Sequence, residues 1–157
     1  MTDREHAYEV QVEWSGNLGT GTSAYGAYSR AHEISVTGKP PIAASADPAF
    51  RGDTARHNPE ELLVAALSGC HMLSYLYLCT QARIVVLAYR DTATGVMTIE
   101  ASGAGRFRQV TLHPVVRLAA GADVQRATAL HERAHALCFI AQSVNFPVEC
   151  QPKFLDT

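Results

Sequence analysis

The sequence predicts an α+β domain in which two helices are segregated from antiparallel strands. Strand-like alternation of apolar and polar residues precedes one long apolar segment, a second block of strand-like stretches follows it, and a second helical pattern comes near the end. Runs of strands interrupted by isolated helices are typical of this class. With 157 residues, of which 47% are apolar and 18% charged, the chain can bury a real core, and we expect one domain over residues 1–157.

The first third of the chain predicts short strands and one long loop. Residues 8–14 (YEVQVEW) alternate strictly and predict a half-buried strand, and residues 25–28 and 32–36 could add one or two more. Glycine and prolines at 38–41 break this pattern, because proline lacks the amide that a sheet ladder needs. Residues 40–57 are small, polar and rich in turn formers, which predicts a functional or mobile loop.

The most informative segment begins at Asn58. Asparagine at the N-cap, Pro59 at the first helical position and two acids in the first turn predict a helix that runs to about Gln81. No charge follows those acids until Arg83, and the segment is apolar on nearly every side. Such a pattern predicts a buried central helix. The apolar segment is near the lower length limit for a membrane span and contains several polar residues, so a core helix is favoured over a membrane helix.

The remainder of the chain predicts strands around a second helix. Strand-like stretches that turn formers separate lie at residues 84–90, 96–102, 107–118 and 146–150. A tight turn at 94–95 predicts that the first two form a hairpin or meander, and Pro114 belongs at an edge or a bulge. Residues 124–143 show apolar positions at spacings of three and four, which predicts a helix with one apolar face that includes Cys138.

Charge and the amino terminus exclude several classes of protein. The net charge is −2, and no run of five like charges occurs, so a nucleic acid is not expected as a partner. The polar start of the chain has no apolar stretch of the kind found in signal peptides. We therefore expect a cytoplasmic protein with no membrane partner.

Four cysteines stand at positions 70, 79, 138 and 150, and none forms a CxxC pair. The chain is too large and too rich in core residues to need a disulfide framework. An isolated buried cysteine such as Cys70 is more often a packed core residue. Ser68-Gly69 just before it weakens that interpretation, because small residues let a helix or a substrate approach the backbone and a glycine inside a helix costs ~1 kcal/mol. If the two helices pack together, Cys138 could meet Cys70, with one thiol attacking and the other resolving. Cys79 and Cys150 are interpreted as structural.

Histidines near these elements leave a metal site open as a minor alternative. Its ligands would be the thiols of Cys70 and Cys138 with the imidazoles of His71 and His135. The neighbouring charges instead predict that His131 lies on a solvated face, and no HExxH signature appears.

Residues 58–70 (NPEELLVAALSGC) resemble the NPE(E/Q)L…AAxxxC segment of the OsmC/Ohr family, the osmotically inducible and organic-hydroperoxide-resistance proteins. The resemblance covers most of the chain and is closest to an OsmC-like subgroup. It implies an intertwined homodimer in which a long central helix and a second helix pack with antiparallel sheets. It also implies a peroxiredoxin-type peroxidase, an antioxidant of the stress response that reduces organic hydroperoxides to alcohols without metal, flavin or haem.

By position, the resemblance makes Cys70 the peroxidatic thiol, Cys138 the resolving thiol and Glu60 the catalytic glutamate. It assigns the activating arginine to Arg51, while Arg30 and Arg56 remain open. The regenerating partner would be a dithiol, either a lipoylated protein or dihydrolipoamide. Apolar side chains expected to line the substrate site are Leu67, Met72, Phe139 and Phe146.

Glu60 and Cys70 lie about 15 Å apart along one helix, so we expect one helix to serve two active sites of a dimer.

Two departures from the family pattern leave room for another function. Cys138 precedes Phe139 where better-known family members have proline, and residues 15–21 lack the arginine of Ohr members. The alternative is a non-catalytic, stress-associated protein that binds an apolar ligand in the same interface pocket.

Overall fold

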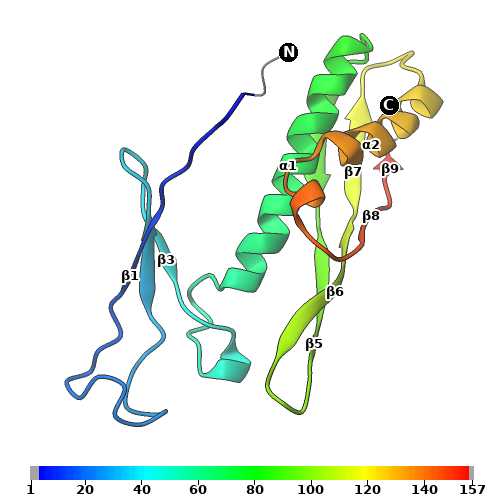
Figure 1. Cartoon of the computed structure of the whole chain (residues 1–157). Helices are drawn as coiled ribbons and strands as arrows, with labels where there is room; N and C mark the ends of the chain where they lie inside the picture. The colour runs from blue at the N-terminus through cyan, green and yellow to red at the C-terminus, as the bar shows by residue number, and fades with distance from the viewer. Residues whose placement is uncertain (1–3, 156–157) are drawn as a thin grey trace. The chain divides into compact units, whose positions relative to one another are not determined.

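A computed structural model describes residues 4–155 of the chain, and Figure 1 traces its elements. The chain divides into two compact units, Met1–Leu62 and Leu63–Thr157. Each unit is described by itself below, and the single domain expected from the sequence stays a prediction. The architecture is α+β, as the sequence predicts.

The first unit contains a three-stranded antiparallel sheet in the order β1-β2-β3. Its strands are β1 (Gln11–Trp14), β2 (His32–Ser35) and β3 (Ile42–Ala44). The expected half-buried first strand is wrong in one respect, because all four residues of β1 are exposed. Alternation shows which residues share a face of a strand, but it does not supply a layer that covers that face.

Two expectations for the first unit need correction. Residues 25–28 form no strand, and Tyr28 makes only an isolated bridge to Asn17. Residues 40–57 are not a simple loop, since they contain β3 and a 3-10 helix at Pro48–Phe50. Asp47 caps that helix by accepting a hydrogen bond from the amide of Ala49.

The long helix α1 (Pro59–Gln81) has the bounds that the sequence predicts. Asn58 and Glu61 form a reciprocal cap: the amide of Glu61 donates to Asn58 Oδ1 at 2.8 Å, and the amide of Asn58 donates to Glu61 Oε2 at 3.3 Å. By length and composition alone, α1 could also cross a membrane, a test that core helices of globular proteins pass as well. The structure corrects the expected all-round burial, because Leu73 is 65% and Tyr77 59% exposed.

Removing this cap should weaken the protein measurably. We expect Asn58→Ala to lower the free energy of unfolding by about 1 kcal/mol, because the buried Asn58 side chain satisfies an amide that has no partner inside the helix. Chemical denaturation of Asn58→Ala and Asn145→Ala would test this, since Asn145 is exposed and caps no helix. Equal losses in the two variants would contradict the capping role.

The second unit holds the rest of α1, a second helix α2 (Val124–Leu137) and two three-stranded sheets. One sheet has the order β4-β7-β9, and the other has the order β5-β6-β8. The strands are β4 (Val86–Asp91), β5 (Thr94–Ile99), β6 (Gly105–Leu112), β7 (Pro114–Leu118), β8 (Val148–Cys150) and β9 (Lys153–Phe154). The last two strands join in parallel, so the sheets are mixed where antiparallel ones are expected.

The predicted hairpin between β4 and β5 is wrong. Thr94 and Gly95 open β5, and β4 pairs with β7 while β5 pairs with β6. The chain therefore changes sheets twice, after Asp91 and at His113, and the amide of His113 donates to Asp91 Oδ1 at 2.7 Å. Local alternation is the same whether consecutive strands pair or part, so it could not show the change of sheet.

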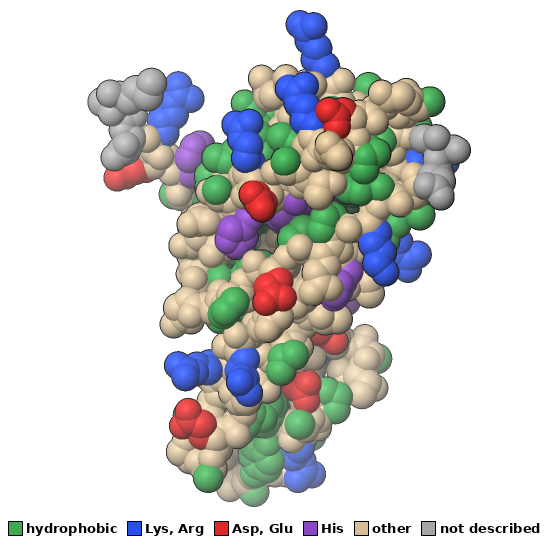
Figure 2. Space-filling model, turned by 90° about the vertical axis from the view of Figure 1, so that its right-hand side faces the viewer, with side chains coloured by type: hydrophobic (Ala, Val, Ile, Leu, Met, Phe, Trp, Pro, Cys, Tyr) green, Lys and Arg blue, Asp and Glu red, His purple; other side chains and the backbone are tan. Residues whose placement is uncertain are grey.

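The second helix is shorter than predicted. It ends at Leu137, and Cys138 follows in an extended conformation as its C-cap, before a separate 3-10 helix at Ala141–Ser143. Cys138 therefore lies at the end of the helix rather than on its apolar face. Apolar residues of α1, α2 and β7 form the larger core, which includes Tyr75, Leu78, Val116, Leu130 and Ala134. Other hydrophobic side chains stay at the surface, and Figure 2 shows them interspersed with charged ones.

Candidate functional site

The two cysteines predicted to act together lie side by side in the second unit. Cys70 lies on α1, and Cys138 lies at the C-cap of α2 with 1% of its surface exposed. Burial, together with the neighbouring Cys70 thiol, raises the pKa of the Cys138 thiol to about 11. Both cysteines carry free thiols, so the arrangement provides two neighbouring sulfur atoms on separate elements.

The early end of α2 places the Cys138 sulfur. The amide of Cys138 donates to the His135 carbonyl at 3.2 Å, after which the chain leaves the helical direction. The amide of Ala141 then donates to Cys138 Sγ at 3.4 Å, a contact that favours a thiolate over a neutral thiol. Phe139 is 80% exposed, which does not fit the lining role expected for it, whereas Leu67 and Phe146 share a core cluster.

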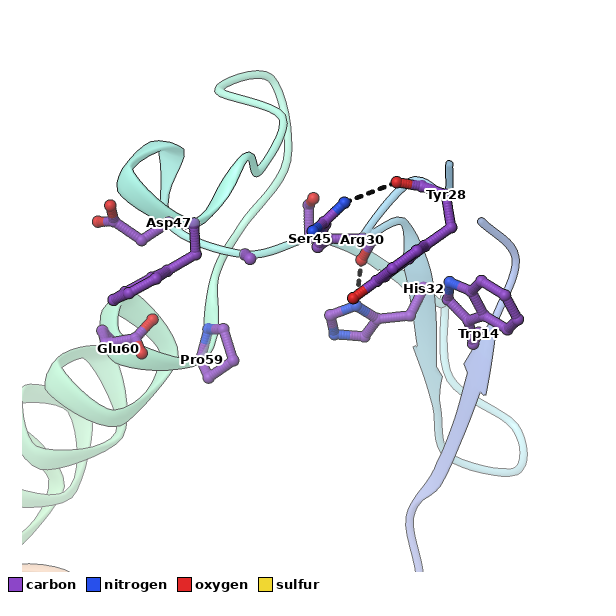
Figure 3. A pocket seen from close by; sticks show the side chains of 10 residues that line it. Trp14, Tyr28, Arg30, His32, Ser45, Asp47, Pro59 and Glu60 are labelled. Carbon is purple, nitrogen blue, oxygen red and sulfur yellow. Dashed lines mark hydrogen bonds between the residues drawn. The ribbon is translucent and has the colours of Figure 1, made fainter. Parts of the chain in front are cut away.

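A separate cavity of about 320 Å³ lies within the first unit (Figure 3). Its lining comprises Trp14, Tyr28, Arg30, His32, Ser45, Ala46, Asp47, Phe50, Pro59 and Glu60. Figure 3 shows Asp47 and Glu60 on one side of this cavity and Arg30, His32 and Trp14 on the other. The cavity thus combines aromatic walls with one guanidinium and two carboxyl groups.

Arg30 is fixed by aromatic rings and backbone carbonyls. Its guanidinium carbon lies 4.3 Å from the Tyr25 ring centroid and 4.1 Å from that of Tyr28. Nη1 donates to the Tyr28 carbonyl at 2.7 Å, and Nη2 donates to the Tyr25 carbonyl at 2.8 Å. A guanidinium has five N–H donors, so this cation is held in place with donors to spare.

Glu60 has an acceptor that the described residues leave unused. Its Oε2 atom is buried and has no hydrogen-bond partner within residues 4–155. A buried carboxylate oxygen without a partner is costly, so it is suited to a donor brought by a ligand or by another chain.

The other two candidate arginines lie outside the lining of this cavity. Arg51 has φ of 63° at the end of the 3-10 helix, and its guanidinium carbon is 5.7 Å from the Tyr25 ring. Arg56 Nε lies 3.8 Å from Asp53 Oδ2, in a loop ion pair. The arginine that shares a cavity with Glu60 is thus Arg30. The nearby tyrosines at positions 25 and 28 are the feature of the sequence that could have indicated a guanidinium held by aromatic rings. The activating role of Arg51 stays a prediction.

The histidines are arranged differently from the predicted metal site. His131 is 3% exposed, so the expected solvated position is wrong, and its ring contacts that of Tyr75 at a centroid distance of 3.8 Å. The atoms that gather within 4.8 Å of one another belong to His71, His131 and Cys150. The predicted metal site of Cys70, His71, His135 and Cys138 is therefore not the group of ligands that the described residues bring together. The charged residues near His131 are exposed: Arg126, Glu132 and Arg133. Their charges suggested that His131 is exposed too, although it lies on the buried face of α2.

Burial sets the protonation of this cluster. It lowers the pKa of His71 and of His131 to about 4, with the charge of His135 adding to the effect on His71 and the Asp91 carboxylate opposing it. Burial also raises the pKa of Cys150 to about 12, helped by Asp91. Both imidazoles are therefore neutral at pH 7, and the Cys150 thiol is protonated.

Comparison with known proteins identifies relatives of the whole chain. The OsmC-like protein family model matches residues 52–153. An OsmC-like protein of unknown function from Vibrio cholerae is 32% identical, with a TM-score of 0.85 over 94% of this chain and 99% of that one. No curated protein matches.

Two more distant structures share the fold. An organic hydroperoxide resistance protein OsmC from Legionella pneumophila, also described as a predicted redox protein, is 15% identical with a TM-score of 0.70, covering 98% of this chain and 100% of that one. The organic hydroperoxide resistance protein OhrB of Bacillus subtilis is 17% identical with a TM-score of 0.62, covering 96% and 98%. Because the family model spans well over half of the sequence, the chain belongs to the OsmC/Ohr family.

Proposed function

We propose that the protein is a thiol peroxidase that reduces organic hydroperoxides to alcohols. The observation that carries this proposal is the contact between the Cys70 and Cys138 thiols, which come from two different elements of one unit. Membership of a family that includes organic hydroperoxide resistance proteins supports it.

The reaction begins at Cys70. Its thiolate attacks the distal oxygen of the hydroperoxide, so that an S–O bond forms, the O–O bond breaks and the leaving alkoxide takes a proton to become an alcohol. The sulfur is oxidised by two electrons to a sulfenic acid. Cys138 then attacks that sulfur, a disulfide forms, and the hydroxyl leaves as water with the Cys138 proton.

A dithiol returns the enzyme to its starting state. Its first thiolate opens the Cys70–Cys138 disulfide to a mixed disulfide, and its second thiol displaces the protein by closing a ring. A lipoylated protein or dihydrolipoamide supplies such a pair of thiols. Because the second step is intramolecular, a dithiol should outperform a monothiol of equal reducing power.

An arginine held near a glutamate stabilises the thiolate and polarises the peroxide in this proposal. Arg51 is the residue assigned by resemblance, and Arg30 is the alternative that shares its cavity with Glu60. Since Glu60 and Cys70 are about 15 Å apart along α1, the two belong to different sites of a homodimer. The exposed Leu73 and Tyr77 on α1 are consistent with a second copy packing there. We place the protein in the cytoplasm, where a reducing environment maintains both thiols.

One observation favours the second candidate, a non-catalytic protein that binds an apolar ligand. Burial keeps the Cys138 thiol protonated at pH 7, which slows the resolving step. Counting the free thiols before and after exposure to one equivalent of hydroperoxide separates the two functions.

Thiol counting after a single exposure to peroxide tests the proposal directly. One equivalent of cumene hydroperoxide should remove two thiols from the reduced protein and lower its mass by two hydrogens. Cys79→Ala, which lacks a buried cysteine outside the pair, should lose the same two thiols. Retention of all thiols in the folded wild-type protein would exclude the peroxidase and leave the binding function.

A further inference from the structure

A second constellation in the Leu63–Thr157 unit lies outside the proposed peroxide chemistry. It brings together His71 from α1, His131 from α2 and Cys150 from β8. His71 Nε2 lies 3.0 Å from His131 Nδ1, and Cys150 Sγ lies 3.6 Å from the first nitrogen and 3.7 Å from the second. Three potential ligand atoms from three elements thus lie within 4.8 Å of one another.

These separations match those between ligands of one metal ion. With Zn–N near 2.05 Å and Zn–S near 2.3 Å, tetrahedral coordination places two nitrogens about 3.3 Å apart and nitrogen about 3.6 Å from sulfur. The two nitrogen–sulfur distances in the protein agree with this geometry, and the nitrogen–nitrogen distance is slightly short. An ion that takes the place of the shared proton would therefore push the two imidazoles apart only slightly.

We propose that His71, His131 and Cys150 form a binding site for a thiophilic divalent cation of the Zn²⁺ class. Two imidazoles and one thiolate are the donors that such ions prefer, whereas Mg²⁺ and Ca²⁺ require oxygen ligands. Three protein ligands leave a fourth position for water or another small molecule. The site does not use Cys70 or Cys138, so it stands or fails independently of the peroxidase.

The surroundings hold the ligands in place. His71 is 1% and His131 3% exposed, and the Tyr75 ring stacks on His131 with an interplanar angle of 10°. Cys150 is only half-buried, which offers a route of entry. The Asp91 carboxylate acts electrostatically on both His71 and Cys150, so a thiolate and a nearby carboxylate balance a divalent charge.

Binding changes the positions of protons and of the rings. The two rings are nearly parallel, at 4°, and their inner nitrogens face each other, so each ring turns toward Cys150 to direct its lone pair at the ion. Each imidazole then carries its proton on the outer nitrogen, and the Cys150 proton passes to solvent. His131 Nε2 is buried without a hydrogen-bond partner in the described part of the chain. Because ligating histidines usually donate from that position, the affinity should be lower than that of a four-ligand structural zinc site.

Cobalt provides a spectroscopic test of the proposal. Anaerobic titration of the reduced, metal-free protein with Co²⁺ should give a thiolate-to-cobalt charge-transfer band and visible bands of tetrahedral intensity, both displaced by Zn²⁺. Cys150→Ser should remove the charge-transfer band, and His131→Asn should weaken Co²⁺ binding by at least about 100-fold. Cys70→Ser and Cys138→Ser are the matched controls and should keep the wild-type spectrum.

Two results would overturn the site. One is the absence of a charge-transfer band in the wild-type protein, and the other is a band that survives Cys150→Ser but disappears in Cys70→Ser. If the variants fail to fold, alkylation of the wild-type protein decides the question. Saturating Zn²⁺ should slow the iodoacetamide reaction at Cys150 selectively, as read from the cysteine peptides, and an unchanged rate at Cys150 would reject the proposal.

Discussion

Replacing Cys70 by serine is expected to slow hydroperoxide turnover by roughly 10³-fold or more, because loss of the nucleophile removes the whole covalent pathway. A hydroxyl is a far weaker nucleophile than a thiolate at pH 7. The measurement is cumene hydroperoxide consumption with dihydrolipoamide as reductant. Cys79→Ala, a change at a core cysteine of the same helix, should retain most of the activity.

Cys138→Ser is expected to give a different defect in the same assay. The first equivalent of peroxide should still be consumed, since Cys70 remains, but steady-state turnover should fall because no disulfide forms. A burst of one equivalent followed by slow turnover, with a sulfenic acid trapped by dimedone, is the expected signature. If Cys70→Ser and Cys138→Ser both turn over like the wild-type protein, the activity does not come from this pair.

Acid is expected to destabilise the metal-free protein by about 4 kcal/mol between pH 7 and pH 4.5. In the unfolded chain a histidine binds its proton near pH 6.5, whereas burial lowers the pKa of His71 and His131 to about 4 in the native state. Between these values the unfolded state binds more protons, so stability is complete above pH 6.5 and is lost as the pH falls toward 4. Each histidine contributes about half of this loss.

Urea denaturation in the presence of EDTA across this pH range measures the effect. His131→Asn should reduce the pH dependence of the unfolding free energy by about half, even if the variant is less stable at every pH. His6→Asn changes an exposed histidine and should leave the slope unaltered. A wild-type slope that His131→Asn does not change would contradict the neutral, buried pair.

Local sequence signals predicted those parts of the fold that depend on neighbouring residues. The cap at Asn58 and the apolar run after it indicated both ends of α1, because an N-cap, a first-turn proline and an uncharged apolar run are all local features of the sequence. The end of α2 was missed because its apolar spacing continues past Leu137 into a 3-10 turn, where the chain bends to pack Cys138. Strand pairing depends on contacts distant in sequence, and so the separation of β4 from β5 was not readable.

The candidate site divides in the same way. The sequence predicted that Cys70 and Cys138 could meet if the two helices packed together, and the thiols do lie close, although Cys138 belongs to the C-cap of α2 and not to its apolar face. Arg30 was ranked below Arg51 because its position depends on how residues 25–30 fold back on themselves, with backbone carbonyls that any sequence would supply. His131 was misplaced because charged neighbours dominate its segment, whereas its own direction on α2 is toward the core.

The two short parallel strands at the end of the chain have a consequence for biosynthesis. Residues 148–150 and 153–154 complete one sheet each, by pairing with β6 and β7. Until residues 148–154 have been synthesised, β6 and β7 therefore each keep one edge unpaired. The same segment carries Cys150, which contacts His71 and His131, so the thiol is synthesised after both histidines. Addition of the last strand to each sheet and assembly of the histidine–cysteine cluster thus depend on one short segment, residues 148–154.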